Sequence, residues 1–379
     1  MSYKLKKYKS KNTHWIIIDL YNIYKREYNY LKKKNLNSDV FIKTLAIQIK
    51  NKILNLTNIK KDDKEDKILQ IILVNQIKNN NNNNNINING IWRKNIISNW
   101  NDKLTIDYDI ITYNNLYENE LSDFIKDNNF IYLNYNLIEI NDVISIITKS
   151  IEYNYLDDMI TIISSDTDFY QLINDKISIL NINGNEDISR ILSSGEINLW
   201  YKIINGNKKN NIPTLKFNSK FIDNFINFND NNDNNDNNDN NDNNMLDEYN
   251  ILEENEYREL SKRELYYFLH HLNSLKKILE INSNYVLNKQ HLINKSLIDF
   301  SNIPDELVNM IEKDFWEIYQ KNNKYFNFKD NKDNKDNKDN NNERFERRID
   351  IITDNKKIKK EIKDTSNNRF NGLEIEDNE

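Results

Sequence analysis

Short runs of apolar residues alternate with longer segments whose apolar residues recur at helical spacing. The runs are typical of strands buried on both faces, and they are Trp15–Asp19, Lys67–Val74, Phe130–Leu133, Met159–Ser164 and Ile177–Ile182. The segments with helical spacing are Phe41–Asn55, 121–127, Ile138–Ile147 and Ile197–Ile204. Strands that alternate with helices and lack hairpin turns predict an α/β fold with a mostly parallel central sheet and flanking helices.

Two polar tracts divide the rest of the chain. The Asn/Asp tract at residues 229–244 and the polar tail at 326–379 contain too little apolar surface to offset the entropy of ordering, so we expect both to be disordered. Residues 245–325, between the two tracts, are expected to form a small helical region. Residues 1–220 are expected to form the α/β domain.

The composition indicates a protein that works inside a cell. The chain has no cysteine, which excludes disulfide scaffolds and thiolate metal sites and fits a reducing compartment. No apolar run is long enough to span a membrane, and the run after the Lys-rich start is too short for a secretory signal. We therefore expect a location in the cytoplasm or nucleus, and neither secretion nor membrane insertion.

The net charge of −6 conceals a segregated distribution of charge. Five aspartates within residues 229–244 account for most of it, and without them the net charge is −1. The first 35 residues carry ten basic residues against two acids. Segregated positive charge suits a surface that binds phosphates, although a solvated Lys-rich terminus explains this segment alone equally well.

Acidic residues follow the ends of several predicted strands. Asp19 closes the first strand, and Asp166 and Asp168 follow the strand that ends at Ser164. Glu139 and Asp142 share one face at the start of a helix. Because ligands of parallel sheets bind beyond the carboxyl ends of the strands, these carboxylates are expected to share one crevice. A cluster of oxygen ligands suits Mg²⁺ or Mn²⁺, and two such ions would activate water and stabilise phosphodiester hydrolysis.

Each acid also has a purely structural interpretation. Asp19, Asp166 and Asp168 are residues that cap helices, and Glu139 is an acid favoured by the positive end of a helix dipole. Taken singly, the structural interpretation is favoured at each position. Taken together, acids at three predicted element edges on one side of a sheet favour a metal site.

Several segments resemble motifs of the 5′→3′ exonuclease and flap-endonuclease superfamily, a PIN-like group, and occur in the family's order. ISSDTDFYQLIND (163–175) resembles its ISSDxDFxQL segment, and EINDVISII (139–147) is similar to its EAxDxIAxL helix. INGNKKNNIP (204–213) resembles the GDKxDNIP loop of a helix–hairpin–helix element, and WRKNI (92–96) lies where the family has WRR. INKSLIDFSNIPDEL (293–307) is similar to the NxxLIDFxxIPD segment of T-even bacteriophage ribonucleases H. The resemblance covers most of residues 14–220 and about 285–320.

The resemblance implies a nuclease domain over residues 1–220, with a helix–hairpin–helix loop at about 196–220. It implies a Mg²⁺- or Mn²⁺-dependent 5′→3′ exonuclease or flap endonuclease with ribonuclease H-type activity, which removes primers and flaps in DNA replication or repair. The expected substrates are 5′-flap, nicked or branched DNA and RNA–DNA hybrids. A clamp or a single-strand-binding protein is a candidate recruiting partner, and we expect a monomer.

The same resemblance assigns roles to the acids and marks four degraded metal positions, Asn75, Asn141, Asn207 and Asn210. Asp166 and Asp168 are expected to hold one ion, Asp19 and Glu139 the other, and Asp142 to orient metal-bound waters. Asparagines replace family carboxylates at Asn75, Asn207 and Asn210, and Asn141 matches the phage form of its helix. Each lost carboxylate weakens the attraction for a cation. The alternatives are therefore a weakened or inactive DNA-structure-binding member of the family, or an RNA nuclease of the wider PIN-like group.

Further residues are candidates for binding nucleic acid. In the NGNKKNNIP loop, Gly206, Lys208 and Lys209 are expected to meet backbone phosphates. Trp92, Arg93 and Lys94 are candidates for flanking a single strand, although we favour a buried core position for Trp92. The four histidines show no ligand spacing, and we expect them on surfaces or helix faces. A fold-stabilising role is expected for Asp299.

Overall fold

The computed structural model describes residues 13–34, 37–58, 68–77, 88–97, 116–136, 138–183, 194–233 and 256–333. Most of the tract at 229–244 and most of the tail at 326–379, both predicted to be disordered, lie outside these residues. The chain divides into two compact units, Met1–Phe315 and Trp316–Glu379. The described part of the second unit is the end of α12 (Asp305–Asp333), and the features discussed below belong to the first unit.

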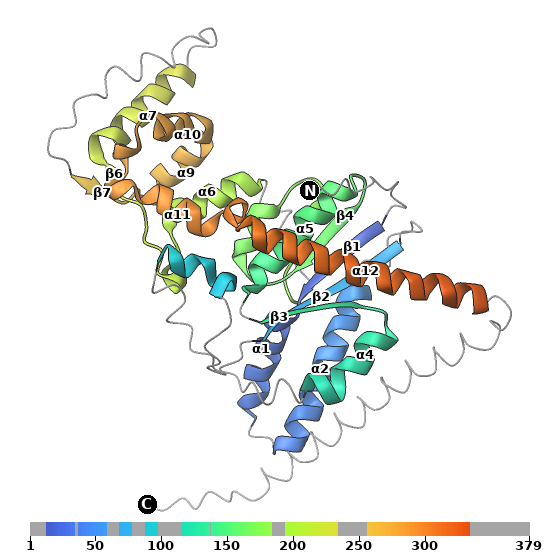
Figure 1. Cartoon of the computed structure of the whole chain (residues 1–379). Coiled ribbons are helices and arrows are strands. Elements are labelled where there is room, and N and C mark those ends of the chain that lie inside the picture. The colour runs from blue at the N-terminus through green and yellow to red at the C-terminus, as the bar shows by residue number, and fades with distance from the viewer. Residues whose placement is uncertain are drawn as a thin grey trace, which may run out of the picture. The chain divides into compact units, whose positions relative to one another are not determined.

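The centre of the first unit is a five-stranded sheet whose strands are all parallel, as the alternation of strands and helices predicts. The strand order is β3-β2-β1-β4-β5. Figure 1 labels the first four of these strands, β3, β2, β1 and β4. The strands are β1 (Thr13–Asp19), β2 (Ile68–Ile77), β3 (Ile131–Asn136), β4 (Met159–Ile163) and β5 (Ile177–Leu180). Every strand therefore ends at the same edge of the sheet, and this edge receives the predicted acids.

Helices cover both faces of this sheet, because its strands alternate apolar side chains between two buried faces (Figure 1). Ile16 and Ile18 point into a core shared with α1 and α2, whereas Trp15 and Ile17 are buried outside that core. The helices of this region are α1 (Leu20–Lys32), α2 (Ser38–Asn58), α4 (Ser122–Asp127), which follows a short π-helical turn, η2 (Tyr117–Leu121), and α5 (Ile140–Asn154). The predicted fold class is thus confirmed.

Residues from both sides of the Asn/Asp tract build a second, helical core. Its stacked and edge-on rings include Phe217, Phe221, Phe225 and Phe268. The elements are α6 (Gly195–Asn205), β6 (Phe217–Asn218), α7 (Ser219–Asp233), β7 (Tyr257–Arg258), α9 (Lys262–His270), α10 (Leu272–Ile281) and α11 (Gln290–Ile298). Short 3-10 turns are η1 (Ile88–Asn95), η3 (Thr167–Leu172), η5 (Lys208–Asn210), η7 (Ser283–Tyr285), η8 (Leu287–Lys289) and η9 (Phe300–Asn302).

His14 departs from the expectation that the histidines lie on surfaces or helix faces, because it is buried within the strand β1, where its Nε2 is 2.8 Å from Thr161 Oγ1. His291 lies on a face of α11, as expected, and this face is buried, with 3% of the His291 surface exposed. Asp299 also has the structural role expected of it, because its carboxylate caps η9 by accepting the Ser301 N–H. None of the described helices is both long enough and apolar enough to cross a membrane.

Candidate metal and nucleic-acid site

A serine hydroxyl links two of the predicted acids at the carboxyl ends of neighbouring strands. Ser164, the first residue after β4, donates its hydroxyl to Asp19 Oδ2 at 2.7 Å and accepts the backbone N–H of Asp166 at 3.0 Å. Asp19, the last residue of β1, also caps α1 by accepting the Asn22 N–H at 2.9 Å. The sequence placed Asp19 and Asp166 at strand ends, but it did not identify Ser164 as the group that joins them.

Asp19 is a buried carboxyl group, with 2% of its surface exposed. Burial raises the pKa of Asp19 from 3.8 to about 6; the hydrogen bonds from Ser164 and Asn22 oppose this rise, and the charge of Asp166 adds to it. The described residues provide no basic side chain in ion-pair contact with Asp19. Asp19 therefore carries a negative charge that is poorly compensated at neutral pH, and a cation nearby would lower its energy.

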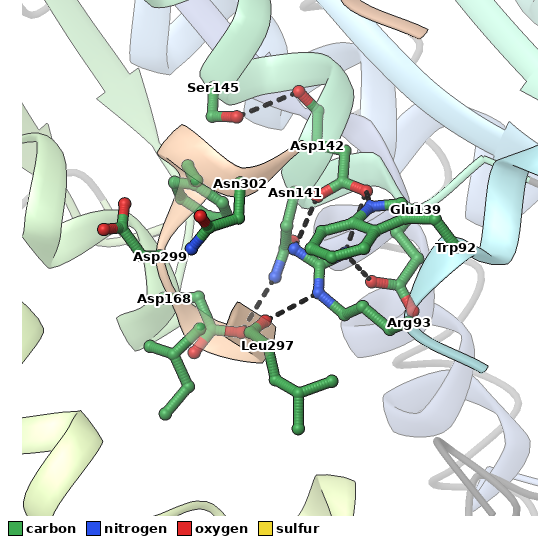
Figure 2. A network of polar contacts seen from close by, with 12 residues as sticks. Trp92, Arg93, Glu139, Asn141, Asp142, Ser145, Asp168, Leu297, Asp299 and Asn302 are labelled. Carbon is green, nitrogen blue, oxygen red and sulfur yellow. Dashed lines mark hydrogen bonds and ion pairs between the residues drawn. The ribbon is translucent and has the colours of Figure 1, made fainter. Parts of the chain in front are cut away.

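Asn141 brings the start of α5 against the turn that follows β4. Asp166 caps η3 by accepting the Asp168 N–H at 2.9 Å, which holds both carboxylates on one turn. The Asn141 side-chain amide donates to Asp166 Oδ2 at 3.3 Å and to Asp168 Oδ2 at 3.1 Å, and Figure 2 shows it pointing at Asp168. The two carboxylates assign the amide nitrogen to this side, so Asn141 acts here as a donor to the acids.

Lys202 supplies a positive charge to the same turn. It belongs to α6, is half-buried, and its ammonium forms an ion pair with Asp168 Oδ1. Gln171 ties this turn to the segment after α11, because its amide donates to the Ile298 carbonyl at 3.0 Å and accepts the Phe300 N–H at 3.1 Å. Neither residue was singled out from the sequence, because no local pattern reveals that α6 and the 298–300 segment meet this turn.

The guanidinium of Arg93 compensates the remaining two acids (Figure 2). It donates to Asp142 through two hydrogen bonds of 2.8 Å each, to Glu139 Oε2 at 2.7 Å, and to the Leu297 carbonyl at 2.7 Å. Burial by itself would lower the pKa of Arg93, but the charges of Asp142 and Glu139 outweigh burial and raise it. Asp142 is wholly buried, and its carboxylate is held by Arg93 and by the Trp92 indole N–H at 2.9 Å.

Of the three residues predicted to flank a single strand of nucleic acid, two are buried and one is exposed. Trp92 has 7% of its surface exposed and its ring lies 4.3 Å from the Arg93 guanidinium carbon, so both residues pack inside the fold. This arrangement matches the core position favoured for Trp92. Lys94 is exposed on the same turn. The assignment of these residues to nucleic-acid binding stays a prediction.

Asn75 lies at the same sheet edge, one residue beyond the Val74 that pairs in register with Asp19. Its side chain is wholly buried, and its amide nitrogen donates to the Tyr132 hydroxyl and to Asn134 Oδ1, each at 3.3 Å. Among the described residues, no group donates a hydrogen bond to Asn75 Oδ1. A buried acceptor without a partner costs about 1–3 kcal/mol, and a hard cation or its bound water would satisfy it.

The NGNKKNNIP loop is a tight turn that continues from α6. Asn207 and Ile212 exchange two backbone hydrogen bonds of 2.9 Å, and the Asn294 side chain ties Ile203 and Pro213 carbonyls to α11. Gly206 has a φ of 67°, and a Cβ there would lie 2.3 Å from the Pro213 carbonyl oxygen, so only glycine fits. Asn210 is buried and Lys208 is exposed, whereas the Lys209 side chain lies outside the described part of the structure.

Among the acids at this sheet edge, Asp19 and Asp166 suit a hard divalent cation better than the others do. The Asp19 carboxylate is tied through the Ser164 hydroxyl to the backbone of Asp166, whose negative charge acts on Asp19. Mg²⁺ is commonly held by one or two carboxylates together with waters and substrate phosphates. Glu139, Asp142 and Asp168 already pair with Arg93 or Lys202. Within the described ranges, no group of three or more His, Cys, Asp or Glu side chains is able to hold a metal ion.

Comparisons with known proteins return likenesses in structure alone. No family model matches the chain, and no curated protein matches it. The structure is similar to a bacteriophage T5 protein co-crystallised with metal ions, at 15% identity and a TM-score of 0.45, over 80% of this chain and 99% of that one. It is also similar to a bacteriophage T5 flap endonuclease in a complex with DNA and metal ions, at 14% identity and a TM-score of 0.44, over 81% and 99%.

A bacteriophage T5 5′-exonuclease with bound zinc matches in the same way, at 14% identity and a TM-score of 0.43, over 80% of this chain and 99% of that one. Because these TM-scores lie below 0.5, the likenesses carry no argument about activity.

Proposed function

We propose that this protein is a divalent-cation-dependent phosphodiesterase that cleaves DNA near a 5′ end or a branch point. The observation that carries the proposal is the buried Asp19 carboxylate at the carboxyl edge of a parallel sheet, which the Ser164 hydroxyl ties to the backbone N–H of Asp166. Enzymes of α/β fold bind their ligands at this edge. Two segments that resemble flap-endonuclease motifs, 139–147 and 163–175, meet at this edge through Asn141, and the order of all the motifs along the chain supports the proposal.

Asp19, Asp166 and Ser164 would have distinct roles in phosphodiester hydrolysis. Asp19 and Asp166 would hold Mg²⁺ or Mn²⁺, which when bound lowers the pKa of water and stabilises charge on the phosphate. The water oxygen would bond to phosphorus and release one proton to solvent, while the bond to the leaving oxygen would break with its electron pair and that oxygen would take up a proton. Ser164 keeps Asp19 oriented, because its hydroxyl is the donor to Asp19 Oδ2.

The proposed substrates are 5′-flap, nicked or branched DNA and RNA–DNA hybrids, in primer and flap removal during replication or repair. The exposed Lys208, on a rigid loop one turn beyond α6, supports contact with a phosphate backbone without reading its sequence. We further propose that the protein acts inside the cell as a monomer, recruited by a clamp or a single-strand-binding protein.

The test is cleavage of a 5′-flap oligonucleotide and an RNA–DNA hybrid with Mg²⁺, with Mn²⁺ and with a chelator. Cleavage that needs the cation and is lost in Asp166→Asn is the expected result. Asp175→Asn is the matched control, because Asp175 is an exposed aspartate that precedes β5, at the opposite edge of the sheet. Absence of cleavage by the folded wild-type protein with either cation would refute the proposal.

A second candidate function is binding of branched DNA without cleavage. The pairing of Arg93 and Lys202 with three of the acids favours it, because these internal cations compete with a metal for the carboxylates. It predicts binding that weakens steeply with salt and leaves the DNA intact. Conversion of Asn75, Asn207 and Asn210 to aspartate should then create cleavage, and a folded triple variant that stays inert would contradict ligand loss as its cause.

A further inference from the structure

Gln171 fastens the turn that carries Asp166 and Asp168 to the carboxyl end of α11. Its side-chain amide donates to the Ile298 carbonyl at 3.0 Å and, within its own turn, to the Asp168 carbonyl at 3.1 Å. Its side-chain oxygen accepts the Phe300 N–H at 3.1 Å. Both donors and the acceptor of the Gln171 amide are thus used, which fixes its orientation and holds the turn to α11.

The same end of α11 is tied to the other two acids at the start of α5. Arg93, which pairs with Glu139 and Asp142, donates through its Nε to the Leu297 carbonyl at 2.7 Å (Figure 2). The last carbonyls of a helix have no partner within it, so α11 offers them to other elements. One helix end therefore anchors both parts of the acid site.

The amino-terminal half of α11 holds the NGNKKNNIP loop. Asn294 donates from its buried side-chain amide to the Ile203 carbonyl at 2.8 Å, just before the loop, and to the carbonyl of Pro213, its last residue, at 2.9 Å. The Asn294 side-chain oxygen accepts the Gln290 amide at 2.9 Å, which fixes the direction of these bonds. The helix α11 is therefore joined both to the loop proposed to meet phosphates and to the turn at the proposed cation site.

We propose that α11 sets the place of the cut in the DNA, and that Gln171 is the positioning residue through which it does so. The inference rests on the proposed function and deepens it. A helix joined to both sites keeps them at a fixed separation, so a duplex that meets the loop at Lys208 presents one phosphate to the sheet edge. Without Gln171 the turn is free to shift against the loop, and neighbouring phosphates reach the cation site as well.

The test is the set of products from a 5′-flap DNA labelled at its 5′ end, cut with Mn²⁺ and separated at single-nucleotide resolution. The wild-type protein should cut at one main position. Gln171→Met keeps the length of the side chain and removes its hydrogen bonds, so it should cut at several adjacent positions. Its kcat should fall at least about tenfold while KM for the DNA stays the same, because small misplacements of the reacting groups are costly.

Two further variants distinguish positioning from a general loss of stability. Thr148→Val removes a buried hydrogen bond of 2.7 Å to Ile144 that stays within α5, and it should cut at the wild-type position. Asn294→Leu releases the loop from the same helix, so its products should match those of Gln171→Met. The double variant should cut no more broadly than either single variant, because both changes break one connection.

The remaining outcomes separate the inference from the function on which it rests. One main cut by a folded Gln171→Met variant, several cuts by the wild-type protein or by Thr148→Val, or a double variant that cuts much more broadly than both single variants would overturn the inference and leave the proposed nuclease untouched. No cleavage by the folded wild-type protein would overturn both. If Gln171→Met does not fold, Gln171→Glu provides the same measurement, because it still accepts the Phe300 N–H and loses both donated bonds.

Discussion

The guanidinium of Arg93 meets the carboxylate of Asp142 through two parallel hydrogen bonds of 2.8 Å, and both side chains are buried. The same guanidinium reaches Glu139 and the Leu297 carbonyl, so one side chain joins η1, the start of α5 and the end of α11. Replacing one partner of such a pair leaves a buried charge without compensation. The stability of the fold and the order of the site are therefore coupled at Arg93.

Arg93→Met is expected to lower the free energy of unfolding by about 3–5 kcal/mol, because Asp142 would remain buried and charged. Arg93→Lys should recover little of this loss, since an ammonium does not form the paired hydrogen bonds. Urea denaturation measures both. Lys94→Met, at the exposed neighbour on the same turn, is the control and should change stability by less than about 0.5 kcal/mol. An Arg93→Met protein as stable as this control would contradict the account.

Asp19→Asn is expected to stabilise the protein at neutral pH. The pKa of Asp19 rises from 3.8 to about 6 on folding, so its contribution to stability is complete below pH 3.8 and is lost as the pH rises through 6. The loss amounts to at most about 3 kcal/mol. Asparagine keeps the cap of α1 without the charge.

Melting temperatures of the wild-type and Asp19→Asn proteins at pH 4 and pH 7.5, without divalent cations, check this expectation. The melting temperature of the variant should rise relative to that of the wild type as the pH rises. Mn²⁺ should raise the melting temperature of the wild type only. A difference in melting temperature between the two proteins that does not change with pH would show that burial does not raise the pKa of Asp19.

Acid should weaken the helical core through His291. Burial, followed by the charges of Lys295 and Lys289, lowers the pKa of His291 from 6.5 to about 4. Its contribution to stability is therefore complete above pH 6.5 and is lost as the pH falls through 4, by at most about 3 kcal/mol. Circular dichroism during acid titration should show this loss in the wild type and much less of it in His291→Gln. His270→Gln, at an exposed histidine, should behave as the wild type does.

Asn75→Asp is expected to tighten Mn²⁺ binding at least about tenfold, which corresponds to about 1.4 kcal/mol. The reason is that Asn75 Oδ1 is buried at the sheet edge without a donor, so a charge there meets a cation directly or through water. Without Mn²⁺ the same change should destabilise the protein, because the carboxylate is buried alone. Asn284→Asp, at an exposed asparagine of η7 in the helical region, is the control for added charge. Equal Mn²⁺ affinities of both variants would contradict a role for Asn75 in cation binding.

The sheet was predictable because each strand is a short apolar run, and all the predicted strands are present. The helix α1 was not predicted. Its buried stripe of Leu20, Ile23, Tyr24, Tyr28 and Leu31 has helical spacing, but tyrosines among lysines and asparagines conceal it from a pattern of apolar residues. Whether such a tyrosine is buried depends on tertiary packing, which the pattern of apolar residues does not show.

The acids of the site were predictable from their positions at strand ends, but their partners were not. Arg93 meets acids that are 46 and 49 positions away in the chain, and Lys202 meets an acid 34 positions away. No local pattern encodes such pairings, because they depend on how α6 and η1 pack against the sheet edge. The charge state of the site is thus a property of the fold.

Anomalous diffraction from crystals grown with Mn²⁺ and a 5′-flap DNA tests the central claim most directly. We predict a Mn²⁺ peak in contact with the carboxylates of Asp19 and Asp166, with a phosphate of the DNA among its other ligands. Bound DNA with no Mn²⁺ at these carboxylates, or Mn²⁺ only at other surfaces of the protein, would contradict the claim that this sheet edge hydrolyses phosphodiesters.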